Sequence, residues 1–168
     1  MNLDELKQGL SSLLDSVSGG WQHMRQAASS ALTSFRPSAQ TNVPEKAEVD
    51  DMFYIPSGTW SMLGANLFED NKRIVVRIEL PGVDKNDLDI EVLDNKLIVR
   101  GEKRFEREGG EGRYRVLQCA YGAFERIVPL TVTVVPDQAT ASFHNGVLRV
   151  ELPKADPGMP QKVRVKIE

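Results

Sequence analysis

Residues Ala141-Ser-Phe-His-Asn-Gly-Val-Leu148 decide the fold of this 168-residue chain. Asn145-Gly146 sits between two runs of strand-forming residues, and both residue types adopt the positive φ angles that a tight hairpin turn requires. Ala141 before the turn, and Leu148 and Val150 after it, can then lie on the inner face of a sheet. The stretch predicts an antiparallel β-hairpin, and it is the strongest hairpin signal in the chain.

Alternating segments lie on both sides of this hairpin. Apolar residues alternate with polar ones over 74–80 and 88–92, and Asp94-Asn95 suits a second tight turn before residues 97–100. Further strand material is expected at 114–116, 123–128, 130–135 and 163–168. At least seven short strands without intervening helices predict an all-β, immunoglobulin-like antiparallel β-sandwich of about 100 residues.

The N-terminal third has a different period. Leucines recur at helical spacing and stop at Gly19-Gly20, and a weaker apolar series from Trp21 to Phe35 stops at Pro37. Residues 36–51 carry neither period and are interpreted as a linker. We therefore expect a partly helical arm with its linker at 1–50, the sandwich at 51–154 and a flexible tail at 155–168.

Composition narrows the function. The net charge of −3 comes from interspersed acids and bases, which gives no reason to expect nucleic acid as a partner. No run approaches the ~20 apolar residues of a membrane span. The acidic residues near Met1 do not suit a secretory signal. The single cysteine, Cys119, fits a reducing compartment, so we expect a cytoplasmic protein.

The sequence offers few candidates for catalytic, metal-binding or phosphate-binding residues. His23 and His144 lie far apart in the sequence without a nucleophile motif nearby, and one cysteine with two distant histidines does not form a zinc set. Residues 109–112 are glycine-rich but lack the lysine of a phosphate loop. We expect no catalytic residues, no cofactor and no metal site.

The hairpin octet closely resembles the A-x-x-x-[ND]-G-V-L signature of the α-crystallin domain of small heat-shock proteins (Hsp20). Three further segments, at 79–84, 97–103 and 121–126, are similar to family segments and follow in the family's order. The resemblance covers residues 67–154. It departs from the family where Leu130 is followed by Thr131 rather than proline, which concerns the end of that strand and not the fold.

The resemblance implies a dimer of the bacterial or plant-like type, in which subunits exchange a strand. The charged loop from residue 104 would carry that strand at 114–119, with Tyr114 and Val116 among its residues. Arg126 matches a family arginine at the dimer interface. The alternatives are a strand position within the chain, and an ordinary surface salt bridge for Arg126.

The resemblance also implies that the tail binds another dimer. Val165 and Ile167 fit the register of the family's Ile-x-Ile pair, and Val163 with Val165 is the alternative pair. The receiving groove would include Ile90 and Val92. An edge strand of the same domain is the other interpretation of the tail.

A chain of this family is expected to be an ATP-independent holdase that binds non-native proteins as a large homo-oligomer. Its clients are expected on the arm, at Leu6, Leu10, Leu13, Trp21 and Phe35, because the sandwich has no obvious place for these side chains. A helix that only holds the assembly together is the alternative role. A co-chaperone that binds one folded partner, and an unrecognised hydrolase, are the alternative functions.

Overall fold

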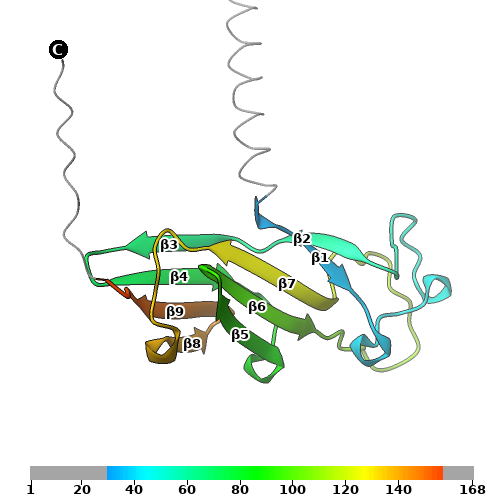
Figure 1. Cartoon of the computed structure of the whole chain (residues 1–168). Helices are drawn as coiled ribbons and strands as arrows, with labels where there is room; N and C mark the ends of the chain where they lie inside the picture. Colours follow the sequence, from blue (N-terminus) through cyan, green and yellow to red (C-terminus); the bar gives the residue numbers. More distant parts are fainter. Residues whose placement is uncertain (1–29, 157–168) are drawn as a thin grey trace, which may run out of the picture. The chain divides into compact units, whose positions relative to one another are not determined.

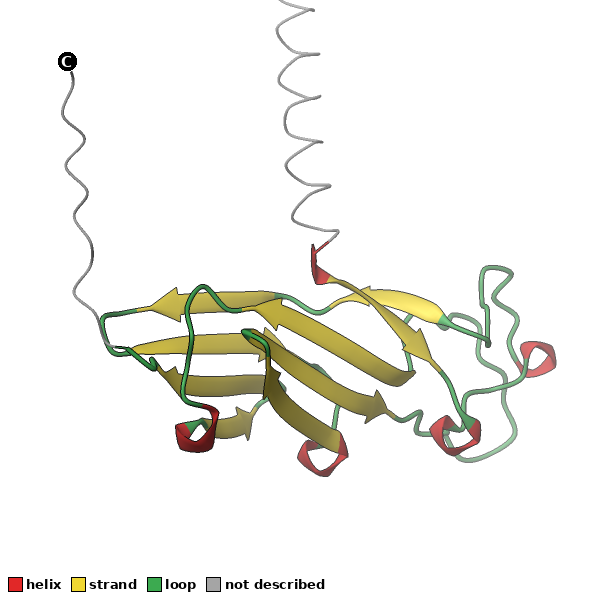
Figure 2. Ribbon diagram, viewed as in Figure 1, coloured by secondary structure: helices red, strands yellow, loops and turns green. Residues whose placement is uncertain are grey.

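The computed structural model describes residues 30–156, and nearly all of its regular structure is β (Figures 1 and 2). The strands are β1 Leu32–Arg36, β2 Thr59–Met62, β3 Ala65–Glu69, β4 Arg73–Glu79, β5 Leu88–Leu93, β6 Lys96–Lys103, β7 Gly122–Pro129, β8 Thr140–His144 and β9 Val147–Pro153. Four short 3-10 helices connect them: η1 Ala39–Thr41, η2 Lys46–Glu48, η3 Lys85–Asp87 and η4 Pro136–Gln138. Apart from Leu32 at the start of β1, all the strands lie within the compact unit that begins at Thr33.

The strands form two antiparallel sheets. One has the order β2-β1-β7-β6-β5 and the other the order β3-β4-β9-β8. Strands β4 and β9 pair along their whole length, from Arg73 opposite Pro153 to Glu79 opposite Val147. The expected antiparallel β-sandwich is therefore confirmed.

The two predicted hairpins are present with their turn geometry. Asn145 has φ 50° and Gly146 has φ 73°, and they join β8 to β9. Asp94 has φ 48° and Asn95 has φ 57°, and they join β5 to β6. Positive φ at both central residues matches the twist of paired strands, which explains why these dipeptides announce hairpins.

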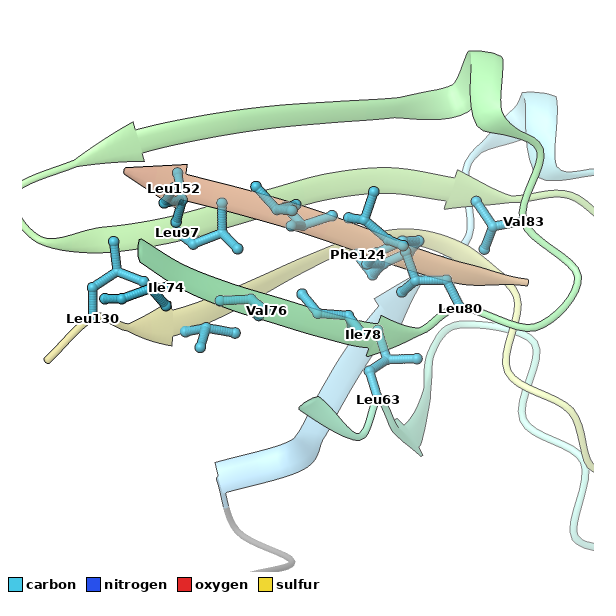
Figure 3. Packing of buried hydrophobic residues seen from close by; sticks show 14 of the residues in the cluster. Leu63, Ile74, Val76, Ile78, Leu80, Val83, Leu97, Phe124, Leu130 and Leu152 are labelled. Carbon is cyan, nitrogen blue, oxygen red and sulfur yellow. The ribbon is translucent and has the colours of Figure 1, made fainter. Parts of the chain in front are cut away.

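Alternation along the central strands builds the core between the sheets (Figure 3). Side chains of β4 and β9 that point inward are at most 1% exposed; they are Ile74, Val76, Ile78, Leu148, Val150 and Leu152. Leu97 and Val99 on β6 close the core from the other sheet. Leu148 and Val150 thus occupy the inner face, as predicted.

The N-terminal boundary of the sandwich differs from the expectation. Strand β1 pairs antiparallel with β7, so residues 32–36 extend the sheet and do not continue a helix. Phe35 is 2% exposed, with its ring centroid 5.1 Å from that of Phe124. Gly122, at φ +121°, permits this approach, because a Cβ there would lie 2.4 Å from the carbonyl carbon of Arg36. The prediction that Phe35 has no place in the sandwich is wrong.

Two expected strands are not found among the described residues. Residues 130–135 contribute one bridge, between Val134 and Lys154. Residues 114–119 likewise contribute one bridge, between Tyr114 and Val49. Strand β7 ends at Pro129, and the Leu130 backbone nitrogen donates to the Asn95 carbonyl at 2.8 Å. This contact still follows the register of the β6–β7 pairs, in which Pro129 lies opposite Lys96, so the pairing with this sheet ends just after Leu130.

Candidate functional site

A groove lies between β5 and β8, each of which is the last strand of its sheet. Its volume is about 390 Å³, and its lining residues are Ile90, Glu91, Val92, Pro136, Asp137, Ala139, Thr140, Ala141 and Val150. Ligand pockets usually measure about 300–1,000 Å³. The groove is thus large enough to receive a short apolar segment.

The groove residues come from both sheets. Ile90 and Val92 alternate with Asp89 and Glu91 on β5, so their side chains face the core and are partly buried against it. Ala141, on β8, lies opposite Val150, on β9. The two residues that were expected to receive the tail therefore share one groove with the hairpin motif.

Ala141 differs from the expectation of an inner, covered position. Its side chain is exposed, whereas Leu148 and Val150 on the neighbouring strand are buried. Strand β8 is the outermost strand of its sheet, so the opposite sheet does not cover Ala141. The exposed alanine is what leaves the groove open on this side.

The groove has acidic residues at its rim. Glu91 accepts a hydrogen bond from Arg100 Nη1 at 2.9 Å. Asp137 has no ion-pair partner within residues 30–156. An apolar floor with carboxylates at its rim favours a ligand that combines aliphatic side chains with positive charge.

A second open edge lies at β3, the other outermost strand of the four-stranded sheet. Leu67 packs against the core, while Phe68 points outward and is 60% exposed. The outer side of β3 has backbone groups that no other strand of the described chain pairs. Such an edge is a template for a further strand.

The loop between β6 and β7 folds against the segment that follows β1. The Asp50 backbone nitrogen donates to the Tyr114 carbonyl at 2.9 Å, and the Leu117 nitrogen donates to the Asp51 carboxylate at 3.2 Å. Beyond Tyr114, the backbone N–H of Leu117 thus bonds to a side chain, that of Asp51, and not to a neighbouring strand. This explains why residues 115–119 form no strand here. Val116 is exposed.

Ion pairs accompany this docking. Arg107 lies 2.8 Å from Glu48, and Arg113 lies 2.7 Å from Asp50, which Arg115 also contacts. The hydrogen bond from Arg107 holds the pKa of Glu48 below its ordinary value. The hydrogen bond from Arg113 does the same to the pKa of Asp50. We call these five side chains the loop latch.

Aromatic rings support the base of the loop. Phe105 is buried, and its ring meets Tyr114 and Tyr121 edge to face with centroid distances of 5.2 and 5.0 Å. The Tyr114 hydroxyl accepts a hydrogen bond from the Glu108 nitrogen at 2.9 Å. Tyr114 thus has a structural role within the chain as described.

Arg126 lies in the middle of β7, and its hydrogen-bond partners are backbone carbonyls. Its Nε donates to Leu63 O at 3.1 Å, and its Nη1 donates to Ile127 O at 2.9 Å. Burial lowers the pKa of Arg126. Among the described residues it makes no ion pair, so the alternative of an intrachain salt bridge is not observed.

Several expected residues lie outside the described part. They are Leu6, Leu10, Leu13 and Trp21 of the arm and Val165 and Ile167 of the tail. Within residues 30–156, no three His, Cys, Asp or Glu side chains are grouped in a way that would hold a metal ion. In the same range, no helix is both long and apolar enough to cross a membrane.

Sequence reasoning missed the edge strand β2. Its residues Thr-Trp-Ser-Met do alternate polar and apolar, and Trp60 and Met62 are exposed. The segment is short and lies within a region whose prolines and glycines favour loops. The alternation was therefore the one available signal.

Known proteins match this chain over the sandwich. The model of the Hsp20/alpha crystallin family matches residues 66–168. Small heat shock protein C2 of Rickettsia felis is 30% identical over 101 residues, which cover 60% of this chain and 66% of that protein. Heat shock protein 16 of Schizosaccharomyces pombe is 33% identical over 99 residues, which cover 58% of this chain and 69% of that protein.

Solved structures of small heat-shock proteins are also similar to this chain. Heat shock protein 16.0 from Schizosaccharomyces pombe has a TM-score of 0.54 at 31% identity, covering 63% of this chain and 97% of that one. A small heat-shock protein from Xylella fastidiosa has a TM-score of 0.50 at 25% identity, covering 64% and 98%. The matched segment spans about two thirds of the length of the curated relatives. The chain belongs to the Hsp20/alpha crystallin family.

Proposed function

We propose that this chain is a subunit of an ATP-independent holdase, a chaperone that binds non-native proteins and slows their aggregation. The match to the Hsp20/alpha crystallin family carries the proposal, and the open groove between β5 and β8 supports it as a site through which the subunits would assemble. A binder of unfolded chains stabilises them by mass action and requires no nucleotide for that. We place this activity in the cytoplasm.

The groove is proposed to receive the tail of another subunit. The candidate pair Val165 and Ile167 encloses Lys166, and the alternative pair encloses Arg164. Either segment matches an apolar groove with Glu91 and Asp137 at its rim. Burial of two aliphatic side chains stabilises by about 1.5–3 kcal/mol each before ordering costs. One tail is a weak contact, and many tails together hold an assembly.

Strand exchange is proposed for the dimer. The free edge of β3 can accept residues 114–119 of a neighbouring subunit. Gly109 and Gly112 have open space around them and provide freedom for the loop to leave. In the exchanged arrangement the loop latch would open, so the docked loop and the donated strand are alternative states of one segment.

Client binding is proposed for the N-terminal arm. Leu6, Leu10, Leu13 and Trp21 supply apolar surface beyond what the sandwich buries. Phe35 is removed from this set, because it is buried against Phe124. A truncation before Phe53 would also delete β1 and damage the fold, so substitutions within the arm test client binding better.

The test is suppression of light scattering from a heat-denatured client by the full chain, with and without ATP. Replacement of Leu6, Leu10, Leu13 and Trp21 by serine should abolish most suppression at unchanged particle mass. A matched control replaces Gln8, Ser11, Ser12 and Gln22 by asparagine and should retain it. Undiminished suppression by the serine variant would remove the arm from the proposal. Absence of suppression by the unmodified chain would remove the holdase itself.

A further inference from the structure

Strand β2 is the outermost strand of the five-stranded sheet, and no other strand within residues 30–156 pairs with its outer edge (Figure 1). Residues 57–64 contain no charged side chain and no proline. Strand β5 at the opposite end of the sheet carries Asp89 and Glu91, the kind of charge that keeps an edge from pairing. The β2 edge lacks this protection.

The exposed side chains of β2 are large and apolar. Trp60 is 65% exposed and Met62 is 58% exposed, whereas Thr59 and Ser61 are partly buried. Alternation along a strand places Trp60 and Met62 on the same face. An uncharged edge with two such residues on one face is suited to strand addition.

The position of β2 follows from the packing of β1. Strand β1 covers the edge of β7, where Gly122 lies against the backbone of Arg36 and Pro37. A strand from outside therefore cannot pair with β7 on that side. The edge of this sheet that is open to another strand is therefore not that of β7 but that of β2, at residues 59–62, two strands further out.

We propose that β2 pairs antiparallel with β2 of a second copy of this chain. Pairing centred on Ser61 places Trp60 opposite the partner's Met62, and Met62 opposite the partner's Trp60. Thioether and aromatic side chains attract one another, and cross-strand pairs stabilise a sheet. The strand is thus complementary to itself, which a two-fold interface requires.

Charge favours a second copy over an unlike partner. A neutral strand meets no like-charge repulsion when it pairs with itself, and it carries no charge that would select a different protein. This contact goes beyond the proposed function, since it uses neither the tail groove nor the exchanged strand. It would join two five-stranded sheets into one continuous sheet.

The experiment is disulfide crosslinking of the full chain with Cys119 changed to serine. Ser61→Cys places two thiols opposite each other at the two-fold axis, within the Cα separations that a disulfide spans. Ser142→Cys in the centre of the edge strand β8 is the matched control. Ser61→Cys should form dimers on mild oxidation to an extent at least about fivefold greater than Ser142→Cys, as expected for a specific cross-strand pair.

Two charge variants in the Ser61→Cys background sharpen the test. W60K with M62E sets lysine against the partner's introduced carboxylate and should retain crosslinking, whereas W60K with M62K sets lysine against lysine and should reduce it about fivefold. Equal crosslinking of Ser61→Cys and Ser142→Cys, or equal loss in both charge variants, would overturn the proposal. In a Trp21→Phe background, a blue shift of Trp60 fluorescence on addition of a tryptophan-free client, without crosslinking, would assign the edge to clients and overturn the proposal too.

Discussion

The centre and the edges of the sandwich differ in what their side chains face. Ile78 and Leu148 face each other across paired central strands and are almost completely buried. Phe68 and Trp60, on the outermost strands β3 and β2, are mostly exposed. Apolar residues at the centre hold the fold, while apolar residues at the edges remain available to other chains. Substitutions in the two regions should therefore affect different properties.

The largest effect is expected at the centre. Leu148→Ala should lower the free energy of unfolding by about 2–5 kcal/mol, because it leaves a cavity between β9 and the opposite sheet. Phe68→Ala at the edge should change it by at most about 0.5 kcal/mol. Denaturant unfolding monitored by circular dichroism measures both. Equal losses would show that the edge residue is part of the core.

A smaller effect is expected where β1 joins the sheet. Gly122→Val should destabilise by about 1–3 kcal/mol, because its side chain would enter the backbone of Arg36 and Pro37. Gly109→Val is the control, since a side chain there meets open space. Thermal unfolding compares the two variants. An unchanged melting temperature for Gly122→Val would mean that β1 is not held at β7.

The hairpins could be predicted because their signals are local. Asn145-Gly146 and Asp94-Asn95 specify their turns by residue type, so the strands beside them follow from alternation. Strand β1 was not predictable in the same way. Its apolar residues continue a helical spacing, and its strand conformation depends on pairing with β7, which is distant in the sequence.

The candidate site shows the same division. Ile90 and Val92 were identified through the family resemblance, and they do lie together in a groove. The exposure of Ala141 was not predictable from alternation, because it depends on where the opposite sheet ends. The loop latch was also missed, because its charged side chains are far apart in the sequence and follow no periodic pattern.

The loop latch should have little effect on global stability. Asp50→Lys should speed amide hydrogen exchange of residues 104–121 while changing the melting temperature little, because its ion pairs are exposed. Glu111→Lys in the same loop is the control. Exchange measured by mass spectrometry on loop peptides distinguishes them. A similar acceleration in both variants would show that the loop is not held by Asp50.

The latch should also respond to acid and salt. The pKa values of Glu48 and Asp50 are lowered from 4.5 and 3.8, so the stabilisation of the docked loop by their ionised carboxylates is complete above these values. It is lost as the pH falls through the lowered values. Proteolysis of the loop should thus change little between about pH 6 and pH 8, increase under strong acid, and increase with added salt. Salt independence at neutral pH would contradict the role of the ion pairs.

The most direct test of assembly through the edges is native mass spectrometry of Ala141→Trp, which fills the groove between β5 and β8. We expect this variant to melt like the unmodified chain but to fall from a large assembly to dimers and to the small species that β2 pairing holds, as should a variant with Val165 and Ile167 both changed to Gly. Ser142→Trp, on the other face of β8, should keep the full particle mass. An unchanged mass for both Ala141→Trp and the tail variant would contradict the claim that this edge groove holds the subunits together.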